Sequence, residues 1–184
     1  MDEQRLSKVK DFAFIAHIKQ VRRYTGEPYY NHLDSVCNMV SQFKNKYKWI
    51  EEIAICHDLF EDTRFGFDDL YYHLLGLGYK RATALFICSS VLEMTDIYTH
   101  EKFPHYDRKK RKLSEADRMK HISPLALTIK YADIIDNAKS IHQYDLNFYK
   151  VYRDECLLLL EFMDKGEQSL RIKALQVLKM PDNI

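Results

Sequence analysis

The residues of this chain most able to do chemistry stand together in the hexapeptide HDLFED at positions 57–62. On one helix His57 and Asp58 would point about 100° apart, so that both could face one cation. Glu61 follows His57 by four residues, and Asp62 follows Asp58 by four, which would place each acid above the earlier residue. Acids crowded in this way repel one another. A divalent metal would neutralise that charge and leave one carboxylate for proton transfer; the simpler alternative is a solvated acidic helix end.

The apolar run at residues 53–56 leads directly into this hexapeptide and places it at the edge of a core, which favours the metal. His32 and Asp133 could complete a set of four ligands with His57 and Asp58. Asp133 lies in an otherwise apolar helix, where a carboxylate is costly unless it is paired or binds a metal. Two alternatives stay open. His32 could be an ordinary helix histidine, and Asp133 could pair with the lysine three residues before it.

The composition excludes several classes of function. The 184 residues include 28 Lys and Arg against 27 Asp and Glu, so no general field attracts nucleic acid or a membrane surface. The N-terminus is charged and no segment approaches about 18 consecutive apolar residues, so we predict a cytoplasmic protein without a signal peptide or a membrane helix. The four cysteines stand singly in apolar segments, which indicates small core residues in a reducing compartment.

Helical periodicity dominates the chain, and its five glycines and four prolines leave little punctuation for strands. We predict an all-α bundle of roughly eight to ten helices in a single domain. That domain spans residues 1–184, with the motifs at about 12–137 and C-terminal helices at 147–180. We expect a basic loop that enters a helix at 96–118. The other expected helices are 6–23, 28–45, 49–62, 68–75, 81–94, 123–142, 148–164 and 168–179.

Three segments carry a pattern that is more specific than a lone His-Asp pair. They are QVRRYTGEPYYNH at 20–32, HDLFEDT at 57–63 and KYADIIDN at 130–137. Together they resemble the HD superfamily of metal-dependent phosphohydrolases, and most closely the hydrolase domains of RelA/SpoT-type alarmone enzymes and small stand-alone alarmone hydrolases. The resemblance implies an HD-domain helical bundle with one bound manganese ion. It also implies a guanosine-3′,5′-bis(diphosphate) 3′-pyrophosphohydrolase, which converts ppGpp or pppGpp to GDP or GTP and pyrophosphate.

The resemblance assigns metal binding to His32, His57, Asp58 and Asp133. Two imidazoles and two carboxylates suit Mn²⁺, although other divalent transition metals also fit such a set. Glu61 and Asp62 match the acidic pair around the attacking water. We expect Glu61 to be the main proton-handling group, because it would share a helical face with His57, and Asp62 to be the second choice.

The resemblance also assigns substrate contacts to the segment before His32. Arg22 and Arg23 match a basic pair that reaches the nucleotide by stacking on the base or by meeting phosphate. The alternative for this pair is a solvated helix end, where cations are favourable. Tyr29 matches a position near the ribose and phosphates, and His17 is expected to be a packing or supporting residue.

Further substrate contacts are expected after residue 100. Asn137 follows Asp133 by four residues and should point into the same site, and Lys130 belongs to the same motif. The basic run at 108–112, which begins with Arg108, could meet the pyrophosphate or form a solvated face.

The expected partner is a small-molecule nucleotide, with no nucleic acid and no membrane, and a homo-oligomer is left open. Two other functions are kept as alternatives. An HD phosphohydrolase acting on a dNMP, ppApp or NADPH would share the metal site. An antitoxin-like module would bind a nucleotide or a protein partner with little turnover. Asp136 and Leu33 depart from the family pattern. These departures remove no metal ligand, so they bear on the choice of substrate and not on catalytic competence.

Overall fold

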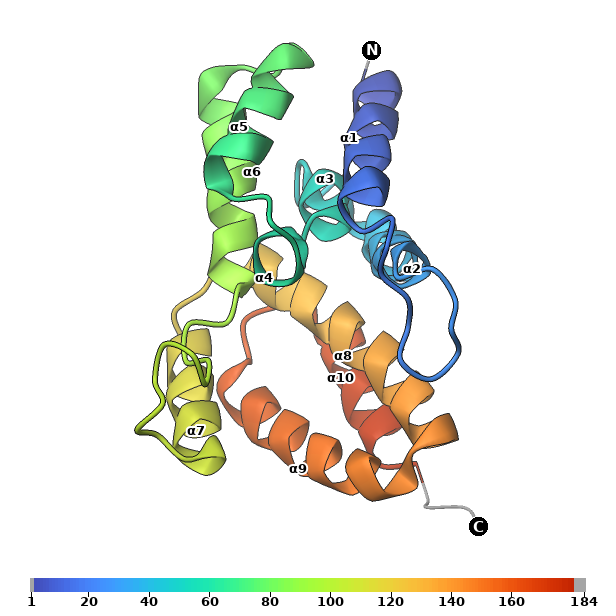
Figure 1. Cartoon of the computed structure of the whole chain (residues 1–184), viewed down its shortest axis with the longest axis vertical. Helices are drawn as coiled ribbons and strands as arrows, with labels where there is room; N and C mark the ends of the chain where they lie inside the picture. The colour runs from blue at the N-terminus through green and yellow to red at the C-terminus, as the bar shows by residue number, and fades with distance from the viewer. Residues whose placement is uncertain (1, 181–184) are drawn as a thin grey trace. The chain divides into compact units, whose positions relative to one another are not determined.

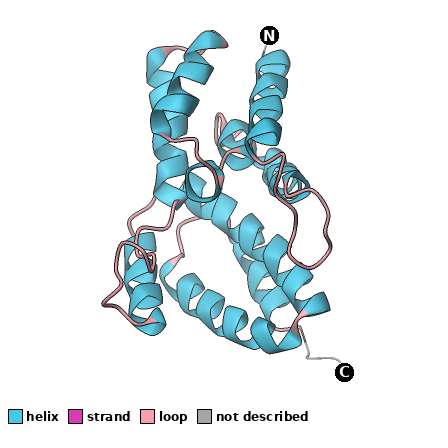
Figure 2. Ribbon diagram, in the orientation of Figure 1, coloured by secondary structure: helices cyan, strands magenta, loops and turns pink. Residues whose placement is uncertain are grey.

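The structure, a computed structural model, describes residues 2–180. These residues form the helices drawn in Figures 1 and 2, and within them the only β pairing is an isolated bridge between Val21 and Pro28. The prediction of an all-α protein is therefore confirmed. The helices divide into two compact units: unit 1 extends to Thr95, and unit 2 begins at Asp96.

Unit 1 is built around the short helix α3, which packs against α1, α2 and α6, while α5 packs along α6 (Figure 1). Apolar side chains of α1, α2 and α3 fill its centre and are fully buried, so the site described below rests on a packed core. Its helices are α1 (Asp2–Ala16), α2 (Tyr30–Val40), the 3-10 helix η1 (Ser41–Phe43), α3 (Ile50–Ile55), α4 (Leu59–Asp62), α5 (Phe67–Gly76) and α6 (Arg81–Met94).

Unit 2 is organised by its longest helix, α8, which packs against α9 and α10, while α7 packs against α9. Ser123 caps α8 because its Oγ accepts a hydrogen bond from the Ala126 amide at 3.2 Å, and Pro124 occupies the first helical position. This is the start that the Ser-Pro pair predicts. The helices of unit 2 are α7 (Arg108–Met119), α8 (Pro124–Tyr144), α9 (Leu146–Phe162) and α10 (Gln168–Leu178).

Two of the expected helices were wrong in extent. The helix expected at 6–23 ends at Ala16, because the chain beyond it is drawn into a loop. In that loop Val21 pairs with Pro28, and the chain reverses at Gly26, whose φ of +70° suits a residue without a side chain. The helix expected at 49–62 is divided into α3 and α4, with a turn between them.

The segment before α7 is held to that helix by a buried acid. Glu115 Oε2 accepts hydrogen bonds from the amides of Ile97 and Tyr98, each at 3.2 Å. A charged acceptor for two backbone donors is stronger than a neutral one. The loop that the polar, basic composition of this segment predicted is therefore hydrogen-bonded, at its first residues, to a side chain of α7.

All four cysteines are buried and free, in agreement with the expectation of small core residues. Burial raises the pKa of Cys37 to about 12, so this thiol stays protonated at neutral pH.

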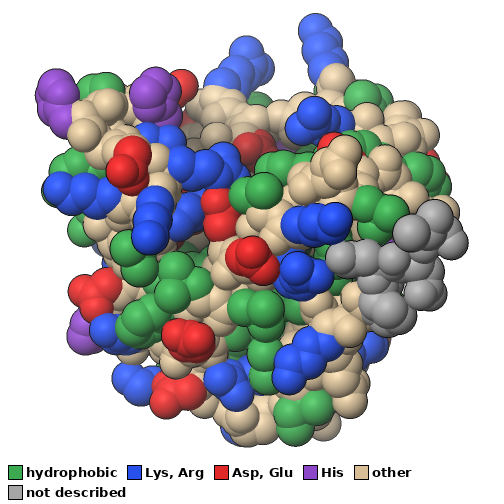
Figure 3. Space-filling view, turned by 90° about the horizontal axis from the view of Figure 1, so that it is seen from below, with side chains coloured by type: hydrophobic (Ala, Val, Ile, Leu, Met, Phe, Trp, Pro, Cys, Tyr) green, Lys and Arg blue, Asp and Glu red, His purple; other side chains and the backbone are tan. Residues whose placement is uncertain are grey.

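Acidic and basic side chains are interspersed on the face of the molecule in Figure 3, consistent with a net charge of +1. Among residues 2–180, no helix combines the length and the apolar character that crossing a bilayer requires.

Candidate metal centre

His57 and Asp58 lie in the turn between α3 and α4, which corrects the prediction of one continuous helix over 49–62. In a continuous helix the Ala54 carbonyl would accept a hydrogen bond from the Asp58 amide. Here it accepts from the His57 amide at 3.3 Å and from His57 Nδ1 at 2.8 Å. The His57 imidazole thus donates to the carbonyl that would accept from the Asp58 amide in a continuous helix. The helical face that Glu61 was expected to share with His57 does not exist.

Three of the predicted ligands, His32, His57 and Asp58, lie together in unit 1. Each offers one ligand atom, and these atoms are all within 4.8 Å of one another. His32 comes from the first turn of α2, and its Nε2 is 3.5 Å from Asp58 Oδ2, while His57 Nε2 is 3.1 Å from the same oxygen. Both imidazoles are almost fully buried. We call this group the HHD cluster.

The hydrogen bond from His57 to Ala54 decides which imidazole nitrogen can bind a metal. Because a carbonyl only accepts, Nδ1 of the neutral ring carries the proton, and Nε2 presents its lone pair toward Asp58. A lone pair and a carboxylate oxygen attract each other only through a proton or a cation. Two imidazole nitrogens and a carboxylate oxygen suit a divalent transition metal, and a backbone carbonyl commonly orients such a histidine. The HHD cluster therefore fits a metal ion.

Asp58 is held in its ionised form. Burial raises its pKa, but protonated His57 and His32 beside it outweigh burial and keep the pKa well below its usual range; where the imidazoles are neutral, a bound divalent cation would supply the positive charge instead. An ionised carboxylate is the form that a metal ligand requires.

The hydroxyl of Tyr29 lies between two carboxylates, 2.8 Å from Asp58 Oδ2 and 2.9 Å from Asp62 Oδ2. The single phenol proton can be donated to only one of them at a time. Desolvation raises the pKa of Asp62, although its side chain is partly open to solvent, and the negative charge of Asp58 raises it further. If Asp62 is protonated, it can donate a hydrogen bond to the phenol oxygen while the phenol donates to Asp58. Glu61 and Asp62 are both solvent-accessible, but this hydrogen-bonded path joins Asp62 to the HHD cluster.

Asp133 lies on α8 in unit 2, where it is buried and has two partners on its own helix. Lys130 Nζ lies 3.2 Å from Asp133 Oδ2, and Asn137 Nδ2 donates to Oδ1 at 2.6 Å. The ion pair with Lys130 that the sequence left open is therefore present. The role of Asp133 as a fourth metal ligand stays a prediction.

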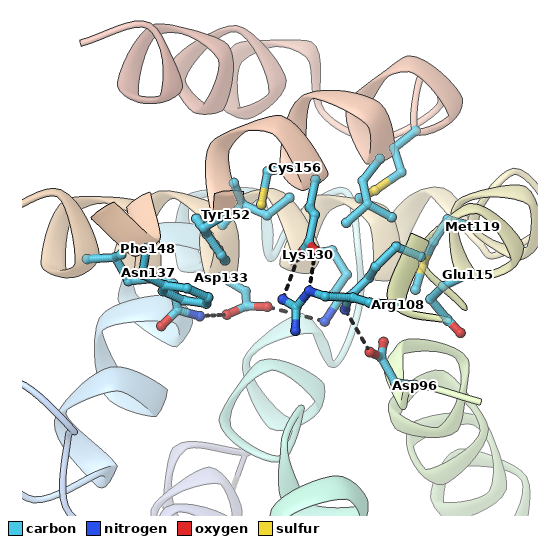
Figure 4. A pocket seen from close by; sticks show the side chains of 16 residues that line it. Asp96, Arg108, Glu115, Met119, Lys130, Asp133, Asn137, Phe148, Tyr152 and Cys156 are labelled. Carbon is cyan, nitrogen blue, oxygen red and sulfur yellow. Dashed lines mark hydrogen bonds and ion pairs between the residues drawn. The ribbon is translucent and has the colours of Figure 1, made fainter. Parts of the chain in front are cut away.

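A cavity of about 300 Å³ in unit 2 brings the predicted substrate residues of this half of the chain together (Figure 4). Arg108, Lys130 and Asn137 line it beside Asp133. Apolar and aromatic side chains, Phe148 among them, complete the lining, so the cavity combines an apolar surface with a few polar groups. This is the usual character of a small-molecule site.

Each cation of this cavity has an acidic partner. Arg108 binds Glu155 with two hydrogen bonds, from Nε at 2.6 Å and from a terminal nitrogen at 3.0 Å. Lys112 Nζ lies 3.5 Å from Asp96 Oδ2, and Lys130 has the partner described above. A phosphate entering the cavity would therefore compete with carboxylates for these cations.

Arg22 and Arg23 lie in the loop between α1 and α2, beyond the end of α1 at Ala16. The alternative of a cation at a helix end is therefore wrong. The Arg23 guanidinium lies 5.4 Å from the centre of the Tyr24 ring, over its face. Contact of this basic pair with substrate stays a prediction.

For two residues close to the HHD cluster, Gln20 and His17, the sequence predicted a smaller role than their contacts indicate. Gln20 was expected inside a helix, and His17 was treated as a packing or supporting residue. The structure places His17 Nδ1 2.7 Å from Gln20 Oε1 and stacks its ring on Tyr29. The sequence feature that could have pointed to Gln20 is that the first segment of family resemblance begins at this residue.

No protein-family model and no curated protein sequence matches the chain. Among solved structures, it is similar to a metazoan ortholog of SpoT that hydrolyses ppGpp and plays a role in starvation responses. The TM-score is 0.77, and the match covers 94% of this chain and 93% of that chain at 20% sequence identity. The two chains share a fold. This likeness to the SpoT ortholog confirms the fold that the three motifs implied.

Proposed function

We propose that this chain is a metal-dependent hydrolase of guanosine alarmones, which converts ppGpp to GDP, or pppGpp to GTP, and releases the 3′-pyrophosphate. The HHD cluster carries the proposal, because it assembles transition-metal ligands from helix α2 and from the turn between α3 and α4. The fold shared with a SpoT ortholog that hydrolyses ppGpp supports the choice of substrate. Such nucleotides are small molecules of the cytoplasm, and we propose that compartment for the reaction.

In the proposed reaction a water oxygen forms a bond to the phosphorus carried by the ribose 3′-oxygen, and the bond between that phosphorus and the 3′-oxygen breaks. The water loses one proton and the 3′-oxygen gains one, so the atoms balance. A divalent ion held by the HHD cluster would supply Lewis acidity and lower the pKa of the attacking water. Carboxylates of the chain would carry the protons.

Asp62 is the proton-handling group that the geometry supports best. It is joined to Asp58 through the Tyr29 hydroxyl, and its raised pKa brings it closer to the range in which a carboxylate exchanges protons at working pH. Glu61, which the sequence favoured, stays a candidate because it is the neighbouring acid on α4.

We further propose Mn²⁺ as the ion and Asp133 as its fourth ligand. Two nitrogens and two oxygens would suit a borderline divalent ion. Each Asp133 oxygen keeps lone-pair capacity after accepting from Asn137 or Lys130, so those contacts leave it able to bind a metal.

We assign the nucleotide contacts to side chains of both units. Arg22 and Arg23 offer planar guanidinium groups for the base or a phosphate, and Tyr29 stands at the HHD cluster itself. In unit 2 the corresponding contacts are proposed for Lys130, Asn137 and Arg108, which line one cavity.

The proposal is tested with the full chain loaded with Mn²⁺ and incubated with ppGpp. We expect equal amounts of GDP and pyrophosphate, measured by product chromatography. His57→Ala should lose bound metal and turnover together, whereas His73→Ala, at a histidine outside the cluster, should retain both. Full metal occupancy without pyrophosphate release would overturn the assignment.

The two candidate acids are separated by amide variants. We expect Asp62→Asn to lower kcat by about 10²- to 10⁴-fold with the metal content unchanged, and Glu61→Gln to have the smaller effect. Asp68→Asn, at an exposed acid on α5, is the control for removal of a surface charge. Loss of metal from the Glu61→Gln variant would instead identify Glu61 as a ligand.

A phosphohydrolase acting on another nucleotide is the second candidate, and the cavity of unit 2 favours keeping it. Its three cations are each paired with an acid, which weakens the case for a highly phosphorylated ligand there. A panel of ppGpp, ppApp, NADPH and deoxynucleoside monophosphates, assayed with the same metal, distinguishes the two. A higher kcat/KM for one of the other nucleotides would select this second function.

A further inference from the structure

Gln20 connects two segments that meet at the HHD cluster. Its backbone carbonyl accepts a hydrogen bond from the Tyr29 amide at 3.0 Å. Its side-chain Nε2 donates to the backbone carbonyl of Asp62 at 2.5 Å. One residue therefore holds both the phenol and the acid that the phenol touches.

The Asp62 carbonyl needs such a donor because α4 is only four residues long. The last carbonyls of a helix have no partner within the helix, and a helix this short is unstable alone. On the same turn the Thr63 hydroxyl donates to the Leu59 carbonyl at 2.7 Å. Gln20 thus supplies from outside a cap that α4 cannot supply itself, and this cap lies on the residue whose carboxylate faces Tyr29.

The same contacts fix the orientation of Gln20 and the protonation site of His17. A carbonyl only accepts, so the Gln20 amide nitrogen must face Asp62 and its Oε1 must face His17 Nδ1, 2.7 Å away. Nδ1 must then carry the proton. The opposite tautomer would leave a buried N–H at Nε2 without an acceptor among the described residues.

The His17 ring also supports Tyr29 directly. The two rings stack with centroids 5.2 Å apart and planes inclined by 13°, and His17 is only 2% exposed. Burial lowers the pKa of His17, which favours the neutral ring that this arrangement requires.

We propose that Gln20 and His17 are positioning residues that hold Asp62 and Tyr29 at the HHD cluster, with His17 as the neutral Nδ1–H tautomer. The role in turnover rests on the proposed hydrolase function, whereas the hydrogen-bond arrangement does not. Neither residue touches the reacting atoms, because Gln20 acts through the backbone of Asp62 and His17 acts through Gln20 and the ring of Tyr29.

Kinetics of the metal-loaded full chain test the role of Gln20. Gln20→Met keeps the length of the side chain and removes both of its hydrogen bonds, and we expect kcat to fall about 10- to 100-fold with KM and metal content nearly unchanged. Gln42→Met is the matched control, because Gln42 also donates to a backbone carbonyl, that of Met39. A Gln20→Met variant with wild-type kcat would overturn the proposal.

Paired variants at His17 separate hydrogen bonding from packing. His17→Phe keeps an aromatic ring against Tyr29 but cannot donate, whereas His17→Asn keeps a donor near the position of Nδ1 and loses the ring. We expect the Asn variant to retain more kcat than the Phe variant, and the reverse order would show that packing alone matters. His73→Phe is the control, since His73 also stacks on an aromatic ring, that of Phe12.

The imidazole ¹⁵N chemical shifts of the wild-type chain test the arrangement without any turnover. We expect the Nδ1–H tautomer at His17, and its loss in Gln20→Met. The Nε2–H tautomer in the wild-type chain would contradict the inference. A metal-loaded chain that shows this Nδ1–H signature but hydrolyses no ppGpp would count against the proposed function alone.

Discussion

At the scale of single residues, the Tyr29 hydroxyl is shared between Asp58, a member of the HHD cluster, and Asp62, an acid beside it. The hydroxyl relates the protonation of one carboxylate to that of the other, because its single proton can be donated to only one of them at a time. This arrangement gives Tyr29 a role at the cluster in addition to the substrate contact proposed from the sequence.

Tyr29→Phe should therefore lower kcat by about 10- to 100-fold while the bound metal is retained, because only the shared hydroxyl is removed. Steady-state kinetics and metal analysis measure the two effects. Tyr30→Phe changes the adjacent tyrosine in the same way and should leave turnover intact. A Tyr29→Phe variant as active as wild type would show that Asp62 needs no such connection.

Arg108 offers a second prediction at this scale, because Glu155 holds its guanidinium with two hydrogen bonds. If Arg108 binds a phosphate of the substrate, Glu155→Gln should lower the KM for ppGpp about two- to fivefold by removing the competing charge. Asp154→Asn, at the neighbouring acid on α9, is the control. An unchanged or higher KM would indicate that Arg108 serves the structure of unit 2.

At the scale of elements, α8 owes its boundaries to local chemistry and its position to close packing. The Ser123 cap and Pro124 fix its start. Gly166 then lies so close to α8 that a Cβ there would come within 2.5 Å of the Tyr131 ring and 3.0 Å of the Leu127 side chain. A residue without a side chain is required for this approach.

Gly166→Ala should lower the free energy of unfolding by about 1–3 kcal/mol, because the added methyl group forces the Tyr131 ring or the backbone of α8 to shift. Urea denaturation measures this change. Gly76→Ala is the matched control, since a Cβ at Gly76 meets no atom within 4 Å and should be tolerated. Equal stability of the two variants would contradict the close contact.

At the scale of the whole molecule, two histidines make stability depend on pH: His17, which is buried, and His73, which is half-buried. Burial lowers the pKa of His73 below its ordinary 6.5, and the same holds for His17. Between the folded and unfolded pKa values the unfolded chain binds more protons, so stability is full above about pH 6.5 and declines as the pH falls toward the lowered folded values.

His73→Phe should reduce this decline, because one of the two groups no longer titrates. The measurement is the free energy of unfolding from urea denaturation at several pH values between about 7 and 5. Parallel curves for the variant and the wild type would show that His73 titrates alike in the folded and unfolded chains.

The sequence by itself determined the helical character of the chain, several helix boundaries, and three residues of the HHD cluster. Apolar periodicity reports burial of a helix face, and the start of α8 depends on the chemistry of Ser123 and Pro124, so local information was enough for these features. The motifs identified His32, His57 and Asp58 because a metal site needs particular side chains.

Only the tertiary structure decided how those side chains are oriented. Periodicity extended the first helix to residue 23 and joined α3 to α4, because a pattern of apolar residues does not show where a side chain takes over a backbone carbonyl. His57 does so at Ala54, and Gln20 does so at Asp62. The second contact joins residues 42 positions apart. The connection of Asp62 to the cluster through Tyr29 thus depends on neighbours that no local pattern reveals.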